Sequence, residues 1–372
     1  MIFTTPTAGH SLARQLDELD ALRRRLGDRA GIAGPWLGSL RRQWRASSAS
    51  SSIEIEGFHV PPAEAMIVSA GGGSLDPQDE DRRALSCYAR AMDHVGVMAD
   101  DSSFRWVERV VLDLHFDACY FQKDKDPGQY RRGPIEVTGP GGGSPAYTGP
   151  PHHEVSALMG EMVEWLGHGD LDAHVVVKAA MAHLHLVSIH PFRDGNGRIA
   201  RIVQSLVLAR GGLLAPEFLS IEEYLGRNTD AYYAALGKVQ GGSYEPQRDA
   251  APWVRFCVRA HIEQAQRRLE QLAEAATRWS YLESLVERRR WPDRLVVALE
   301  QSLFEGVDRA SYAAEADVSA PTATNDLRRL LDAQLVVRRG KGRTTRYSAS
   351  ELLRANVQQH LDGRGSSHDE TA

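Results

Sequence analysis

The residues best suited to chemistry stand in one stretch, HPFRDGNGRIAR, from His190 to Arg201. A strongly apolar run, Val175–Ile189, comes directly before it, and the pattern after it predicts a helix. Gly195–Arg198 would therefore stand at a helix N-terminus, where unpaired backbone N–H groups bind anions. Glycine lets the backbone approach a phosphate closely, and Arg198 and Arg201 are spaced to reach one polyphosphate.

Two further side chains of this stretch suggest a reaction at that phosphate. Asp194 is a candidate ligand for Mg²⁺, shared with phosphate oxygens. Histidine titrates near neutrality, so His190 is a candidate to take a proton from an attacking hydroxyl group. The alternative is an ordinary Gly-Asn-Gly loop between two helices, in which the histidine is structural.

A second stretch, SSIEIEG at Ser51–Gly57, combines serine, glutamate and glycine. Taken alone, it has the composition of a solvated helix end. Serine caps helices, glutamate is favoured in a first turn, and glycine stops a helix.

The histidines near the apolar run raise the question of a transition metal. His183 and His190 share a helix face, whereas His185 points elsewhere. No cysteine pair or HExxH pattern accompanies them, so a zinc site is not expected. We expect His183 and His185 to be core residues.

The elements that must position these residues are predicted to be mainly α-helical. Leucines at three- and four-residue steps mark an amphipathic helix near the N-terminus: Leu12, Leu16, Leu19, Leu22 and Leu26. Residues 127–148 are rich in turn formers around one short β-like piece, 134–138, which predicts a hairpin or flap. Helical patterns return after it.

These patterns divide the chain into consecutive parts. We expect an N-terminal helical region at 1–100, a core at 101–265 and a separate module at 282–355. A disordered tail is expected at 363–372.

The composition is that of a globular protein, with 42% hydrophobic and 25% charged residues and a formal net charge of −5. This balance does not force a nucleic-acid or membrane partner. The three cysteines form no CxxC pair, which suits a reducing compartment. No signal-peptide h-region is present, and the longest apolar run is too short to span a bilayer. We therefore expect a soluble, cytoplasmic protein without a membrane partner.

The stretch HPFRDGNGRIAR matches every fixed position of HxFx(D/E)GNGRxxR, so the chain resembles Fic-domain proteins over roughly residues 100–262. The resemblance implies an all-helical core with a β-hairpin flap. It also implies transfer of AMP from ATP to a Ser, Thr or Tyr hydroxyl of a protein. Kinase-like relatives alter the second half of the GNGR loop, whereas Gly197 and Arg198 are intact here. Transfer of UMP or phosphocholine stays open, because the motif contacts phosphates.

The resemblance further implies a role for each matching residue. His190 would be the general base, Phe192 a packing anchor, and Asp194 the residue that holds Mg²⁺ against the α- and β-phosphates. Arg198 and Arg201 would bind the β- and γ-phosphates. The implied nucleotide-binding set is Glu56, Ile135, Glu136, Val137, Thr138, Arg193, Asp194, Gly195, Asn196, Gly197, Arg198, Arg201, Tyr232 and Gln240.

Within that set, Gly195–Gly197 with Asn196 would form an anion hole through backbone amides. Residues 135–138 would be the flap edge, which aligns the target segment by strand addition. Tyr232 and Gln240 would contact the adenosine, although many relatives carry Asn at the latter position.

The second stretch gains meaning from the same resemblance. Ser52, Glu56 and Gly57 match the (S/T)xxxE(G/N) inhibitory helix of autoinhibited Fic proteins. By that resemblance Glu56 would pair with Arg201, remove the partner of the γ-phosphate and leave ATP in an unproductive pose. Such a pair is geometrically demanding, because arginine binds a carboxylate in a fixed fork.

Residues 308–347 resemble a winged helix-turn-helix, with a first helix at 308–316, a turn at 317–319, a recognition helix at 320–333 and a two-stranded wing at 335–347. Between Pro321 and Tyr347 seven basic residues outnumber two acidic ones, a balance compatible with DNA. A winged helix that binds a protein is the alternative.

The sequence thus predicts an autoinhibited protein adenylyltransferase whose substrates are ATP and a protein hydroxyl. Two alternatives stay open. One is a nucleotide-sensing transcriptional regulator, and the other is a hydrolase that removes AMP, with Glu56 positioning the water. A homodimer also stays open, and the target protein is not indicated.

Overall fold

The computed structural model describes residues 1–32, 34, 36–69, 71, 78–138, 145–212, 218, 220–304, 306–340, 342 and 345–365. The chain forms two compact units, each built from separate segments. Unit 1 comprises Met1–Gly27 and Trp44–Arg267, and unit 2 comprises Asp28–Gln43 and Arg268–Ala372. The predicted domains were continuous stretches of sequence, whereas each unit combines separate stretches. Local composition does not reveal which distant segments pack together.

The described elements are mainly helices, as predicted. Those with residues in unit 1 are α1 (His10–Ile32), α2 (Leu37–Glu54), α3 (Pro62–Ser69), α4 (Glu80–Asp100), α5 (Glu108–Cys119), α6 (Val155–His168), α7 (Val175–Ile189), α8 (Asn196–Arg210), α10 (Glu222–Arg227), α11 (Thr229–Gln240) and α12 (Ala251–Arg288), with short 3₁₀ helices η1 (Lys123–Lys125) and η2 (His152–Glu154). The continuous helices α1, α2 and α12 each extend into unit 2. The five leucines predicted to face the core in α1 are all buried.

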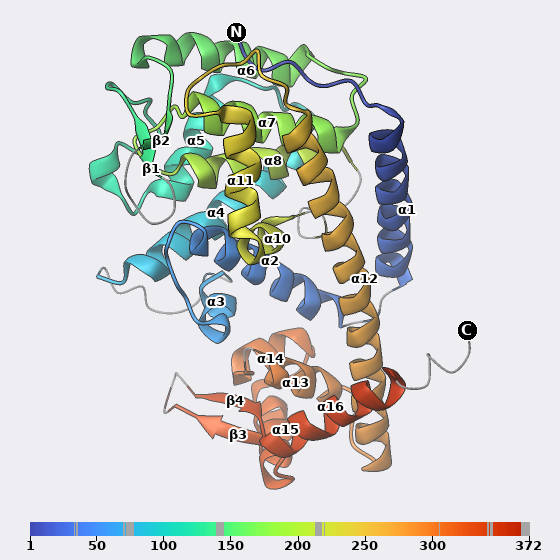
Figure 1. Cartoon of the computed structure of the whole chain (residues 1–372). Helices are drawn as coiled ribbons and strands as arrows, with labels where there is room; N and C mark the ends of the chain where they lie inside the picture. The colour runs from blue at the N-terminus through green and yellow to red at the C-terminus, as the bar shows by residue number, and fades with distance from the viewer. Residues whose placement is uncertain are drawn as a thin grey trace. The chain divides into compact units, whose positions relative to one another are not determined.

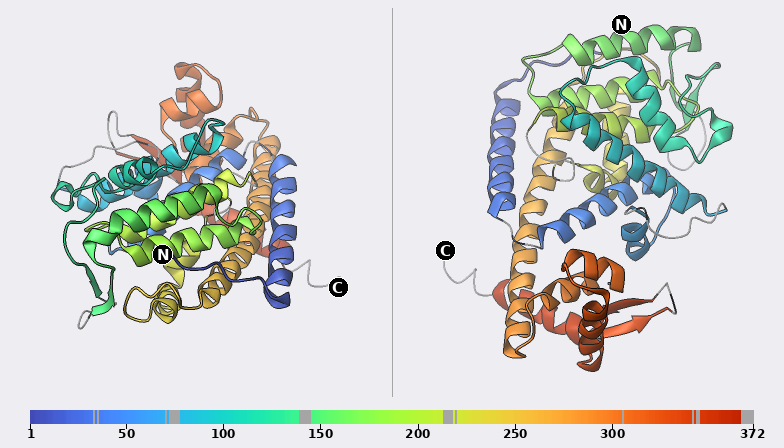
Figure 2. Two further views of the ribbon diagram at one scale, coloured as in Figure 1. Left: turned by 90° about the horizontal axis from the view of Figure 1, so that it is seen from above. Right: turned by 180° about the vertical axis from the view of Figure 1, so that it is seen from behind.

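The middle of unit 1 is the pair α7 and α8 (Figure 1 and Figure 2). The apolar run forms α7, which is apolar on all sides because α6 and α8 enclose it. In turn, α8 packs against α4 and α5. The loop between α7 and α8 is therefore held between buried helices. None of the helices in the described ranges is long and apolar enough to cross a bilayer.

The predicted flap is a hairpin of two short antiparallel strands, β1 (Glu136–Thr138) and β2 (Pro145–Thr148). Val137 lies opposite Tyr147. Residues 139–144, which join the two strands, lie outside the described part of the chain. The hydroxyl of Tyr147 donates to the backbone oxygen of Ser188, at 2.5 Å, which ties the hairpin to the end of α7.

The elements that lie wholly in unit 2 are α13 (Leu295–Leu303), α14 (Arg309–Glu315), α15 (Ala320–Asp332), β3 (Val336–Arg339), β4 (Arg346–Ala349) and α16 (Glu351–Gly365). The two strands pair antiparallel, and Val307 adds a bridge to Tyr347. Buried Leu353 and Val357 hold α16 in place, and this helix includes residues 363–365 of the predicted tail. The rest of the predicted tail, 366–372, lies outside the described residues.

Candidate active site

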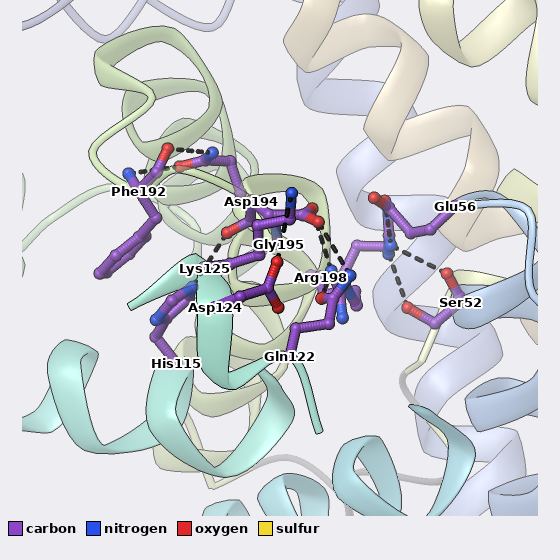
Figure 3. A network of polar contacts seen from close by, with 12 residues as sticks. Ser52, Glu56, His115, Gln122, Asp124, Lys125, Phe192, Asp194, Gly195 and Arg198 are labelled. Carbon is purple, nitrogen blue, oxygen red and sulfur yellow. Dashed lines mark hydrogen bonds and ion pairs between the residues drawn. The ribbon is translucent and has the colours of Figure 1, made fainter. Parts of the chain in front are cut away.

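The loop between α7 and α8 is closed by a side chain at the start of α8. Oδ1 of Asn196 accepts from the backbone N–H of Phe192 at 2.9 Å, and Nδ2 donates to the backbone oxygen of Phe192 at 2.9 Å (Figure 3). The fully buried Phe192 ring stacks on the ring of His115, with 3.6 Å between centroids, so it is a packing anchor as predicted. Since its side chain holds the loop, Asn196 offers an anion chiefly its backbone N–H.

At two positions of the loop, 195 and 197, a residue larger than glycine would collide with its neighbours. Gly195 has a φ of 76°, and a Cβ there would also collide with Sγ of Cys119. A Cβ on Gly197 would stand 2.5 Å from Oε1 of Glu56. The second glycine therefore leaves room for an acidic group at the N-terminal end of α8.

Asp194 is oriented by bonds at both of its carboxylate oxygens (Figure 3). Oδ1 accepts from the backbone of Gly195 at 2.5 Å and from Arg198 at 3.1 Å, and Oδ2 accepts from Gln122 at 3.0 Å. The side chain is 34% exposed, so a cation can still approach it. A site with one carboxylate fits Mg²⁺, which takes its other ligands from phosphates and water. Across the described ranges, no three His, Cys, Asp or Glu side chains gather as a metal-binding group.

His115, which was not predicted, holds the backbone of Asp194 in place through a hydrogen bond. Its Nδ1 accepts from the backbone N–H of Gly128 at 2.8 Å, so Nε2 carries the proton and donates to the backbone oxygen of Asp194 at 3.0 Å. Burial lowers the pKa of His115 to about 4, which keeps the ring neutral in this arrangement.

Arg198 and Arg201 are almost fully buried, yet their hydrogen bonding is incomplete. Nη2 of Arg198 donates to Oε1 of Gln122 at 2.9 Å and to Asp194. Nε and Nη1 of Arg198, and Nη1 of Arg201, have no partner among the described residues. Leaving a buried charged donor unbonded is costly. The two arginines therefore suit an anion that accepts several hydrogen bonds, such as a phosphate chain.

Arg201 is also held by the end of α2, as predicted (Figure 3). Its Nη2 donates to Oε1 of Glu56 at 2.8 Å, while its Nε donates to Oγ of Ser52 at 2.7 Å. Glu56 lies in the turn that follows α2, where Gly57 adopts a φ of 91° and the helix stops. Burial disfavours the charge on Arg201, but Glu56 together with Tyr232 and Tyr88 outweighs burial, and the pKa of Arg201 is raised. A solvated helix end is therefore excluded.

His190 ends α7 with a left-handed backbone, at a φ of 50°. Its Nδ1 lies 3.1 Å from the backbone oxygen of Val187, which can only accept, so Nδ1 carries the proton and Nε2 offers a lone pair. Burial lowers the pKa of His190 to about 4. This pKa lies below the value near neutrality that the sequence predicted for His190, and at such a pKa the ring is an unprotonated base at pH 7.

Comparison with known proteins agrees with this geometry. Residues 106–208 match the model of the Fic/DOC family. They form a Fic domain. The protein adenylyltransferase fic-1 of Caenorhabditis elegans is 29% identical over 175 residues, which cover 47% of this chain and 29% of that protein. A uridine 5'-monophosphate transferase of Xanthomonas campestris pv. campestris (strain 8004) is 28% identical over 184 residues, 47% of this chain and 33% of that protein. The chain thus spans about a third of the length of these curated relatives.

The fold has close counterparts among solved structures of Fic proteins. A Fic family protein from Desulfovibrio desulfuricans G20 superposes with a TM-score of 0.59 at 21% identity, over 93% of this chain and 98% of that chain. The helical fold around the Fic domain is therefore shared with known structures.

Three side chains predicted to bind the nucleotide have other partners. The half-exposed Arg193 donates to Asp126 at 3.0 Å. Tyr232 is buried, with its hydroxyl 3.1 Å from Nε2 of His183. Gln240 donates to Oγ of Ser188 at 3.1 Å. Direct contact of these side chains with a nucleotide stays a prediction.

Arg131 connects the flap of the Fic domain to His190. Like His115, Arg131 was not predicted. Arg131 is 4% exposed and donates to three backbone oxygens, from Nε to His190 at 2.8 Å, from Nη1 to Gly133 at 2.7 Å and from Nη2 to Pro150 at 2.5 Å. Both ends of the flap and the histidine are thus fastened to one guanidinium. The sequence offers no sign that distinguishes Arg131 from its exposed neighbour Arg132.

Among the predicted flap residues, Ile135 lies just before β1 and packs towards Gly149. Glu136 and Thr138 are exposed, and Val137 is half-buried. In the described part, β1 pairs with β2 on one edge. The other edge is the one that strand addition would use.

Proposed function

We propose that this chain is a protein adenylyltransferase, which transfers AMP from ATP to a Ser, Thr or Tyr hydroxyl of another protein. The observation that carries the proposal is the set of buried N–H groups of Arg198 and Arg201, in the first two turns of α8, that have no hydrogen-bond partner among the described residues; His190 stands at the end of α7, directly before the same loop. Donors for a phosphate chain and a base on one short loop–helix segment suit transfer from a nucleoside triphosphate. The curated relatives named as adenylyltransferases add support.

In the reaction, Nε2 of His190 takes the proton of the target hydroxyl as its oxygen attacks the α-phosphorus. A phosphorus–oxygen bond to the target forms, the bond to the β-phosphate oxygen breaks, and pyrophosphate leaves. Arg198, Arg201 and the backbone N–H groups at the start of α8 bind the departing phosphates. Asp194 would hold Mg²⁺, which neutralises phosphate charge when bound. Strand addition at the free edge of β1 would align the target segment.

Glu56 is the inhibitory residue of this proposal. Its carboxylate bonds Arg201 and stands over Gly197, at the end of α8 where a terminal phosphate would be bound. Two anions cannot share one donor set without strong repulsion, so the γ-phosphate and Glu56 compete.

The test is transfer of label from α-³²P-ATP to protein, compared with α-³²P-UTP, by the wild-type chain and Glu56→Gly. Strong labelling from ATP by Glu56→Gly supports the proposal, and stronger labelling from UTP would assign a different nucleotide. Binding of ATP without any labelling would favour a nucleotide sensor. Release of AMP from previously labelled protein by the wild type would favour the hydrolase.

A second function, binding of DNA by unit 2, is favoured by exposed basic side chains on two neighbouring elements, α15 and β3. The exposed side of α15 carries Arg328 and Arg329, and β3 adds exposed Arg338 and Arg339. Asp326 does not offset them, because it is buried and bonded to Arg294. Mobility shift of duplex DNA by the full chain should weaken steeply with salt and be lost in Arg328→Glu/Arg329→Glu. Absence of any shift at low salt would favour a protein partner for this surface.

A further inference from the structure

Unit 2 contains a cavity that none of the functions above uses. Its volume is about 200 Å³, several times the roughly 30 Å³ that a water molecule occupies in the liquid. The described residues that line it are Trp36, Ser39, Trp279, Val297, Glu300, Gln301 and Glu315. They come from segments that are all part of unit 2, and most of them are buried.

The walls of the cavity combine apolar surface with polar side chains, as small-molecule sites do. Trp36, Trp279 and Val297 supply the apolar part. The indole N–H of Trp279 donates to Glu283 at 2.8 Å. Because Glu283 does not line the cavity, this donor already has a partner and does not need one in the cavity.

The polar groups of the lining are mainly acceptors. Both oxygens of Glu300 accept from Arg278, at 2.9 to 3.2 Å. The side-chain nitrogen of Gln301 donates to Glu315, and Glu315 accepts from Arg42 at 3.3 Å as well. Oε1 of Gln301 is buried and has no partner in the part of the chain that the structure describes.

The unmet requirement of this cavity is therefore a hydrogen-bond donor. A buried acceptor left without a partner destabilises a protein, and a ligand N–H group would relieve that cost. Because Arg278 and Arg42 already balance the carboxylates of Glu300 and Glu315, the preference for a cation rests on the faces of the tryptophans, which attract a positive charge and not an anion. Because each carboxylate already has an arginine partner, a single positive charge fits better than a divalent metal ion.

We propose that this cavity binds a small organic cation, an ammonium or amidinium group on an apolar body. The N–H group would donate to Oε1 of Gln301, and the body would lie against Trp36 and Trp279. The proposal does not depend on the transferase activity.

The test uses the full chain and isothermal titration calorimetry with four probes of similar size. Benzylamine and benzamidine carry the expected charge, benzyl alcohol is a neutral donor, and benzoate is an anion. We expect both cations to bind at least tenfold more tightly than benzyl alcohol, and benzoate not to bind. Equal affinity for all four, or no binding of either cation at millimolar concentration, would leave a cavity filled by water and overturn the proposal.

Variants locate the binding. Gln301→Met removes the acceptor with little change in size and should weaken the binding of benzylamine at least tenfold. Gln358→Met, an exposed glutamine on α16, is the matched control. If Gln301→Met fails to melt cooperatively, Glu315→Gln removes charge at a partly exposed position and should weaken benzylamine but not benzyl alcohol. Unchanged affinity for benzylamine in Glu315→Gln and in any folded Gln301→Met would refute the site.

Discussion

Oε1 of Glu56 lies 2.8 Å from Nη2 of Arg201, so a residue of the N-terminal segment is bonded directly to the second arginine of the HPFRDGNGRIAR stretch. If this pair excludes the γ-phosphate, Glu56→Gly should raise self-labelling from α-³²P-ATP by tenfold or more, since about 1.4 kcal/mol corresponds to a factor of ten in rate. Glu54→Gly is the matched control, because Glu54 is exposed on the same segment. Equal labelling by wild type and Glu56→Gly would remove the inhibitory role.

The arginine of the pair gives a second, independent test. Arg201→Ala in the Glu56→Gly background should abolish the gain, because both substitutions act on the same contact. Labelling by the double variant that equals Glu56→Gly would place the γ-phosphate elsewhere.

His190→Ala should lower AMP transfer by about 10²- to 10⁴-fold while ATP affinity stays within a few-fold, because general-base catalysis acts on the hydroxyl and not on nucleotide binding. Labelling and calorimetry are measured in the Glu56→Gly background. The pKa of about 4 adds a pH signature: transfer should decline only as the pH falls towards 4, where the ring becomes protonated. A decline centred near pH 6.5 would contradict the burial of the base.

Arg131→Lys keeps the charge but loses the planar fork that bonds three backbone oxygens. We expect transfer to fall at least tenfold, with ATP affinity unchanged, because the flap and His190 lose their common anchor. Arg132→Lys, at the exposed neighbouring position, should have no effect. A melting curve identifies any loss of folding, and a tenfold loss of ATP affinity would show a role in nucleotide binding instead.

Asp194→Ala should abolish the effect of Mg²⁺ on ATP binding, because one carboxylate commonly completes a magnesium–phosphate site. Calorimetry with ATP, with and without Mg²⁺, measures this directly. A magnesium effect that persists in the variant would assign the ligand to another residue.

Acid should destabilise unit 1 through its buried histidines. Burial lowers the folded-state pKa to about 4 or about 3 in His115, His183, His185 and His190. The unfolded chain, with a histidine pKa of about 6.5, binds protons first, so stability is complete above that pH and falls between it and about 4, by roughly 1.4 kcal/mol per pH unit for each histidine. Urea unfolding at pH 7, 6 and 5 should reveal this slope. His185→Leu should reduce the slope of stability against pH by the contribution of one histidine. An unchanged slope in this variant would contradict the lowered pKa of His185.

The sequence was most informative where function depends on residues close together in the chain. The loop at 190–201, the apolar α7 and the flap were predicted from local pattern. The contact between Glu56 and Arg201 was predicted from a family resemblance, because nothing in the spacing joins two residues so far apart. His115 and Arg131 escaped prediction for the same physical reason. Their roles come from backbone oxygens that only the folded chain brings within reach.

The bonds from Asn196 to Phe192, and the stacking of Phe192 on His115, are internal to the chain. The loop at 190–201 is therefore preorganised, and bonds within the chain hold its shape. Binding ATP would then carry little entropy cost for ordering this loop. Differences in affinity between variants at Glu56 would report electrostatic competition for Arg201 and not a change in loop order. Inhibition of this kind is graded by the concentration of ATP, whereas a site that had to fold first would respond to temperature and denaturant as well.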